Sequence, residues 1–119
     1  MQYIEKDPLG YNQHAAGAKL DHGKIRAGLV LGDFARALAE VARVGTFGAE
    51  KYTPHGWLDV PNGEERYTDA LYRHLLHEAA GEMYDPDSNL FHAAHAAWNA
   101  LARLELMLRE FEGLDKVKQ

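Results

Sequence analysis

The chain has 119 residues, a formal net charge of −5 at pH 7 and no cysteine. The length suits one domain with a real hydrophobic core and leaves little room for a second domain. The lack of cysteine excludes disulfides, thiolate metal sites and cysteine nucleophiles, and the acidic balance argues against a protein that binds duplex nucleic acid through a cationic surface.

The first part of the chain, residues 1–24, predicts loop or extended structure, because glycines, a proline and many polar residues occur there without helical periodicity. Asp33 is a good N-cap for a first helix, since apolar residues then recur at three- and four-residue spacing. These apolar residues are Phe34, Leu38, Val41 and Val44. Gly45 and Gly48 are expected to end this helix or to bend it.

The second half of the chain predicts two further helices. Residues 53–64 contain two prolines and two glycines and are expected to form a loop, after which a helix is expected over 68–81. The turn DPDSN then offers Asp87 or Ser88 as the cap of a longer helix over 90–111. Its apolar stripe consists of Ala94, Trp98, Leu101, Leu104, Leu108 and Phe111. The tail over 113–119 is expected to fray.

These elements predict an all-α fold without internal repeats or strands. Residues 1–119 are expected to form a single domain of three main helices with a loop-rich N-terminal third. Three helices of this size leave apolar surface uncovered, so we expect an oligomeric helix bundle, as a homodimer or homotetramer.

Histidines and carboxylates gather around the turn between the second and third predicted helices. At 100° per residue, His74 and Glu82 fall within an arc of about 80° on the second helix, and Asp85 would continue that arc. On the third helix, His92 and His95 share an arc of about 60°. Because a short turn makes the two helices antiparallel, these side chains are expected to meet.

Carboxylate oxygens and imidazole nitrogens together predict a divalent-metal site. Mg²⁺ prefers oxygen ligands, whereas Mn²⁺, Co²⁺, Ni²⁺ and Zn²⁺ accept nitrogen, so direct ligation by His92 or His95 would favour a transition metal. Burying so many ionisable groups together is costly unless a cation or ligand compensates, which favours a functional interpretation. For His77 and Glu78 nothing beyond spacing points to function, and we interpret Glu78 as a solvated carboxylate and His77 as a hydrogen-bonded core histidine.

Five segments, in order along the chain, resemble hallmarks of the small phage-borne dATP/dGTP diphosphohydrolases, relatives of the MazG-type all-α nucleotide pyrophosphohydrolases. The segments are KLDHGKIR (19–26), FGAEKY (47–52), PHGW (54–57), RYTDALYRH (66–74) and GEMYDPDSNLFHAAH (81–95). The resemblance implies a MazG-like domain that uses a divalent metal, Mn²⁺ or Mg²⁺, to hydrolyse a purine deoxynucleoside triphosphate to its monophosphate and pyrophosphate. If the protein is phage-encoded, it would act in the host-cell cytoplasm.

One departure from the wider MazG superfamily leaves the ligand set open. In that superfamily an E-x-x-E pair on one helix and an E-x-x-D pair on the next bind the metal. Here the corresponding pair on the third helix is His92 and His95. Either these histidines replace the carboxylates, or Glu82 and Asp85 supply the pair and the histidines lie behind them.

The residues that the resemblance and the spacing select receive three expected roles. The expected catalytic groups are Glu82, Asp85 and His74, and the expected metal ligands are His74, Glu82, Asp85, His92 and His95. The expected substrate-binding residues are Lys19, Asp21, Lys24, Arg26, Lys51, Tyr52, Trp57, Arg73 and Asn99. Lys and Arg side chains would pair with phosphates, the two aromatic residues would stack on the purine or pack in the core, and the asparagine would bond the base or sugar or line a polar pocket.

The alternative hypothesis is a non-enzymatic helical module that uses its histidines for a structural metal or a partner interface. A histidine/aspartate phosphohydrolase is disfavoured because the chain has no HD dipeptide, and a P-loop enzyme because GxxxxGK[ST] is absent. No apolar run approaches the roughly 20 residues that span a bilayer, and the N-terminus MQYIEKDPLG lacks the features of a signal peptide. We therefore expect a cytoplasmic protein without a membrane partner.

Overall fold

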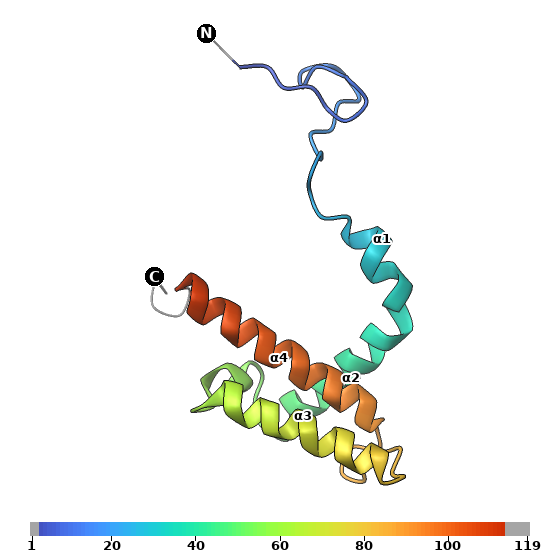
Figure 1. The fold of residues 1–119 in the computed structure, drawn as a ribbon, viewed down its shortest axis with the longest axis vertical. Helices are drawn as coiled ribbons and strands as arrows, with labels where there is room; N and C mark the ends of the chain where they lie inside the picture. The colour runs from blue at the N-terminus through green and yellow to red at the C-terminus, as the bar shows by residue number, and fades with distance from the viewer. Residues whose placement is uncertain (1–2, 114–119) are drawn as a thin grey trace. The chain divides into compact units, whose positions relative to one another are not determined.

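The computed structural model describes Tyr3–Gly113 and divides the chain into two units, 1–33 and 34–119. The helical elements are α1 (Ala27–Leu31), the 3₁₀ turn η1 (Gly32–Phe34), α2 (Ala35–Lys51), the 3₁₀ turn η2 (Gly56–Asp59), α3 (Gly63–Ala79) and α4 (His92–Glu112). Extended pairing within the described residues is limited to two isolated bridges, Lys6–Asn12 and Tyr84–Phe91. The predicted all-α fold with three main helices is therefore confirmed (Figure 1).

The first unit is loop-rich up to α1, and a carboxylate organises its loop. Asp7 is buried, and its Oδ1 accepts hydrogen bonds from the backbone N–H groups of Leu9 (3.0 Å) and Tyr11 (2.8 Å). Its Oδ2 accepts another from the N–H of Lys19 at 3.1 Å. One side chain thus joins the start of the loop to the segment over 19–26.

Helix α2 differs from its prediction at both ends. Asp33 lies in η1 and is not the N-cap of α2; that position is Phe34, which makes no side-chain cap bond. Gly45 and Gly48 do not end the helix, which continues to Lys51. A Cβ on Gly45 would lie 3.2 Å from Nε1 of Trp98 on α4. This glycine therefore serves close packing of two helices, a role that local sequence does not reveal.

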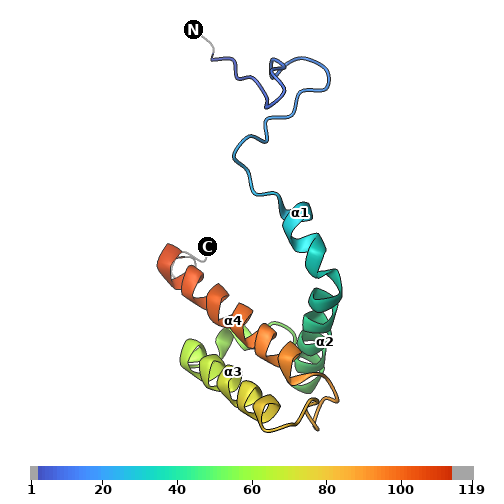
Figure 2. The same ribbon diagram turned by 45° about the vertical axis from the view of Figure 1, so that its right-hand side comes forward.

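In the second unit, α3 and α4 run antiparallel side by side, and α2 packs against α4 (Figures 1 and 2). Helix α3 begins at Gly63, earlier than the predicted start near Thr68. Glu64 and Glu65 occupy its first turn, where negative charge stabilises a helix N-terminus. The predicted loop over 53–64 therefore contains η2 and the start of α3.

Helix α4 has nearly the predicted length, but its predicted cap is wrong. Its N-cap is Phe91 without a side-chain cap bond, so neither Asp87 nor Ser88 caps it. The predicted apolar stripe is only partly buried: Leu101 is 50 % and Phe111 89 % exposed. The buried positions are small or polar, namely His92, Ala94, His95, Ala96, Asn99 and Ala102. Alanines let α4 approach its neighbours closely, and the larger apolar side chains are left outside.

An aromatic cluster completes the packing of the second unit. Trp57, Tyr67 and Trp98 meet edge to face, with ring centroids 5.6–6.1 Å apart. The hydroxyl of Tyr67 donates a hydrogen bond to the carbonyl of Trp57 at 2.7 Å. No helix within Tyr3–Gly113 is both long and apolar enough to cross a membrane. The tail that was expected to fray lies, beyond Gly113, outside the residues that the structure describes.

Candidate metal centre

The site is built on the loop that joins α3 to α4. Helix α3 ends at Ala79, and Gly81 follows with φ of 101°, a conformation that favours glycine. The loop then closes through two backbone hydrogen bonds, from the N–H of Asp85 to the carbonyl of Leu90 (2.8 Å) and from the N–H of His92 to the carbonyl of Met83 (2.9 Å). The end of α3 and the start of α4 are held together in this way.

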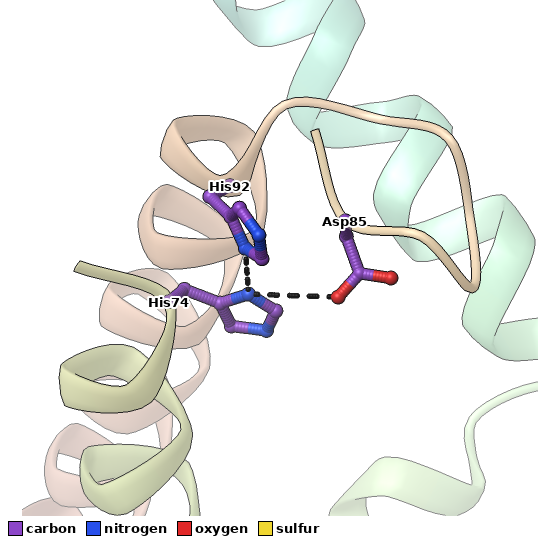
Figure 3. Close-up of side chains that lie close together, drawn as sticks. All are labelled: His74, Asp85 and His92. Carbon is purple, nitrogen blue, oxygen red and sulfur yellow. Dashed lines mark hydrogen bonds and ion pairs between the residues drawn. The ribbon is translucent and has the colours of Figure 1, made fainter. Parts of the chain in front are cut away.

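Asp85 uses its two carboxylate oxygens differently. Oδ1 accepts hydrogen bonds from the backbone N–H groups of Asp87 (2.8 Å) and Ser88 (3.1 Å), which shapes the turn. Oδ2 lies 3.8 Å from Nδ1 of His74 on α3. The same side chain therefore organises the loop and directs negative charge at an imidazole (Figure 3).

A short chain of polar contacts links both helices. Nδ1 of His74 lies 2.9 Å from Nδ1 of His92, and Nε2 of His92 lies 2.7 Å from Oε1 of Glu82 (Figure 3 shows the first contact). A carboxylate oxygen accepts, so Nε2 of His92 donates to Glu82. His92 is only 1 % exposed, and both of its ring nitrogens have partners.

Two more imidazoles stack on this chain. The His95 ring lies parallel to that of His74, with centroids 4.5 Å apart, and the His77 ring lies parallel to that of His92 at 5.2 Å. Nε2 of His95 is 2.6 Å from Oγ of Ser88, which also accepts the N–H of Leu90. Ser88 was not predicted as a partner of this histidine, because a serine in a turn carries no such signal.

Electrostatics favour the neutral form of two imidazoles, His74 and His95, and the ionised form of Asp85. Burial, with a smaller Coulombic effect of His95, lowers the pKa of His74 to about 4. Burial also lowers the pKa of His95, although Asp85 opposes it. For Asp85, burial raises the pKa, but the N–H groups of Ser88 and Asp87 and the nearby histidines outweigh it, so the pKa lies below its usual value. Neutral imidazoles and a carboxylate are the forms that bind cations.

Two groups of three side chains have ligand atoms close enough for one cation, within 4.8 Å of one another. The first is His74, Asp85 and His92, and the second is His77, Glu82 and His92. Each offers two nitrogens and one oxygen, a donor set that suits Mn²⁺ and later transition metals better than Mg²⁺. The structure thus brings together the five predicted ligands, while dividing them between two groups and leaving His95 beside the first.

His77 belongs to the second of these groups, although the sequence did not predict it there. Its side chain is 59 % exposed and so does not lie in the core, and its Nδ1 lies 3.8 Å from Oε1 of Glu82. Its spacing of three residues from His74 was the signal that could have placed it in the cluster. Glu78 is exposed and belongs to neither group.

The predicted substrate-binding residues of the second unit lie in different surroundings. Lys51 pairs with Oδ2 of Asp87 at 2.6 Å, and this bond raises the pKa of the lysine. Tyr52 is 76 % exposed, which leaves its ring open to a ligand, whereas Trp57 packs in the aromatic cluster. Asn99 is buried and donates to the carbonyl of His95 within its own helix at 2.9 Å. Arg73 is exposed on α3.

The other predicted substrate-binding residues belong to the first unit. They are Lys19, Asp21, Lys24 and Arg26, and all four are exposed. Their expected role in binding phosphate stays a prediction.

Comparison with known proteins identifies the family. The model of the dATP/dGTP diphosphohydrolase N-terminal family matches residues 14–116. The chain is also similar to a dATP/dGTP diphosphohydrolase of Salmonella phage PMBT28, with 38 % identity over 81 residues that cover 68 % of this chain and 26 % of that protein. The chain thus spans about a quarter of the relative's length. No solved structure matches it. The chain belongs to the dATP/dGTP diphosphohydrolase N-terminal family, and the resemblance read from its motifs is confirmed.

Proposed function

We propose that this chain hydrolyses purine deoxynucleoside triphosphates, with dATP and dGTP as the first candidates, to the monophosphate and pyrophosphate with the help of a divalent cation. The observation that carries the proposal is the convergence of His74, Asp85 and His92 at the junction of α3 and α4. The family membership and the activity that the phage relative is named for support the substrate class. A metal site alone would not distinguish this function from a structural one.

The residues of the first group would hold the cation: His74, Asp85 and His92. A cation bound there would polarise phosphate oxygens and make a water nucleophilic near pH 7. Glu82 accepts the Nε2 proton of His92 and thereby directs the lone pair of Nδ1 toward His74 and the cation position. His95 lies over the His74 ring, where its neutral imidazole can take a proton from water that attacks the α phosphorus.

The triphosphate brings several negative charges, so cations of the chain are needed beside the metal. Lys51 is the candidate in the second unit, because its partner Asp87 is 61 % exposed and such surface pairs contribute little stability. A phosphate can therefore displace that carboxylate at small cost. An open hollow of about 420 Å³ lies beside this lysine's helix, lined among others by Arg43, Phe47 and Ser88. The hollow is open to solvent, so it offers a nucleotide a surface and not an enclosed pocket.

We also propose that the protein assembles into a homodimer or homotetramer in the host cytoplasm. Large apolar side chains remain exposed on α4, including Leu104 at 50 % and Leu108 at 44 %. Such a face on a soluble helix is typical of a protein interface.

The experiment that tests the function is release of pyrophosphate from each of the deoxy- and ribonucleoside triphosphates, with Mn²⁺, with Mg²⁺ and with a chelator. Monophosphate and pyrophosphate from dATP or dGTP, only with added metal, is the expected result. Release of nucleoside and tripolyphosphate would show that another bond is cleaved and would refute hydrolysis to the monophosphate and pyrophosphate. Absence of turnover under all conditions would refute the enzymatic function and favour the non-enzymatic module.

A further inference from the structure

The second cation group lies at the exposed edge of the cluster and includes His77, which the proposed hydrolysis does not use. We propose that His77, Glu82 and His92 form a separate site for a transition-metal ion of the Zn²⁺ type, and that an ion bound there withdraws His92 from the group with His74 and Asp85. Excess zinc would then inhibit the protein through its own ligand cluster. This inference goes beyond the proposed function, because it concerns another ion at another set of ligands.

Distances support the site. Oε1 of Glu82 lies 2.7 Å from Nε2 of His92 and 3.8 Å from Nδ1 of His77. Two ligands on a tetrahedral ion with bonds of about 2.1 Å are separated by about 3.4 Å. Both separations lie within about 1 Å of that value, so small side-chain rotations would suffice. The rings of His77 and His92 lie parallel, with an interplanar angle of 13°, so the exposed His77 ring would turn for its in-plane lone pair to point at the same ion as that of His92.

The donor set and the exposure determine which ion would fit. Two imidazole nitrogens and one carboxylate oxygen suit Zn²⁺, Co²⁺ or Ni²⁺ better than Mg²⁺ or Ca²⁺. His77 is 59 % and Glu82 46 % exposed, so water can complete the coordination and both side chains can adjust. His92 is held in place by burial and supplies a fixed ligand.

The two groups exclude each other at His92. Its Nδ1 faces His74, and its Nε2 faces Glu82. A neutral imidazole has a lone pair on only one of its two nitrogens. An ion on Nε2 therefore leaves the proton on Nδ1, which then donates to His74 and cannot bind a cation. With the ion in either group, the His74 and His92 rings together keep two N–H protons. Moving the ion therefore changes only which nitrogen of each ring carries the proton.

The test is a Zn²⁺ titration of the full metal-free chain, read by competition with a chromophoric chelator. We expect His77→Gln to bind Zn²⁺ at least about tenfold more weakly than wild type, since even outer partners of metal ligands contribute that much. His14→Gln is the matched control, because His14 is exposed and belongs to neither cation group. It should bind as wild type does, and circular dichroism should show unchanged helix content in both variants.

A second readout uses turnover. Zn²⁺ added to the Mn²⁺-supported reaction should inhibit wild type at lower concentration than His77→Gln, while both show the same rate without zinc. Equal Zn²⁺ affinity of wild type and His77→Gln would overturn the second site, and so would an equal loss in His14→Gln. The titration needs no substrate, so failure of nucleotide hydrolysis would refute the proposed function alone.

Discussion

Replacement of Asp85 can separate the folding role of this side chain from its chemical role. Oδ1 accepts two backbone N–H groups at 2.8 and 3.1 Å, whereas Oδ2 faces His74 at 3.8 Å. Asparagine keeps an acceptor for the two N–H groups and removes the charge, and alanine removes both. Because each hydrogen bond to a charged group contributes about 1.5–3 kcal/mol, we expect Asp85→Ala to lower the free energy of unfolding by about 3 kcal/mol. Asp85→Asn should lower it by about 1 kcal/mol.

The two variants are compared by urea unfolding without metal, by Mn²⁺ affinity from electron paramagnetic resonance, and by pyrophosphate release. Asp85→Asn should lose at least about tenfold in Mn²⁺ affinity and most of its turnover while remaining folded. Wild-type Mn²⁺ affinity and turnover in Asp85→Asn would refute the role of Oδ2 as a ligand. Equal stability of the two variants would refute the role of Oδ1 in the turn.

Three further predictions concern other members of the site. The pKa of His74 is about 4 in the folded chain and 6.5 when unfolded, so the unfolded chain binds more protons between these values. The unfolding free energy of metal-free protein should therefore fall, by at most about 3 kcal/mol, as pH falls from 6.5 to 4. Urea unfolding at several pH values in that range should show that the unfolding free energy of His74→Gln changes less steeply with pH than that of wild type. The same pH dependence in both proteins would contradict the lowered pKa of His74. Glu82→Ala should abolish turnover while circular dichroism shows an intact fold, and preserved activity would remove Glu82 from the mechanism. Lys51→Met should raise KM for the triphosphate about tenfold with little change in kcat. Asp87→Asn, which breaks the same surface pair, is the control and should not raise KM. An unchanged KM in Lys51→Met would exclude Lys51 from phosphate binding.

The sequence predicted the meeting of the two helix ends because only local information was needed. A short turn between two helices makes them antiparallel and brings their adjoining ends together, although α3 ends at Ala79 and Glu82 follows in the loop and not on the predicted helical arc. The contacts from His74 to His92 and from His92 to Glu82 agree with that reasoning. The functional roles of these side chains stay predictions.

Features that depend on tertiary packing were not predictable in this way. Gly45 looked like a helix end, but its small size serves the approach of Trp98 from α4. Leu101 belonged to the predicted apolar face, yet it is half exposed because alanines form the buried side of that helix. His77 was interpreted as a core histidine, but it is exposed, and its stacking on His92 depends on how α3 and α4 pack.

A crystal of the protein grown or soaked with Mn²⁺ and a non-hydrolysable dGTP analogue gives the most direct check. Anomalous difference density should show a metal peak bounded by His74 of α3, Asp85 of the loop and His92 of α4, with the triphosphate beside it. A nucleotide bound elsewhere, with no metal peak between those three side chains, would contradict the account.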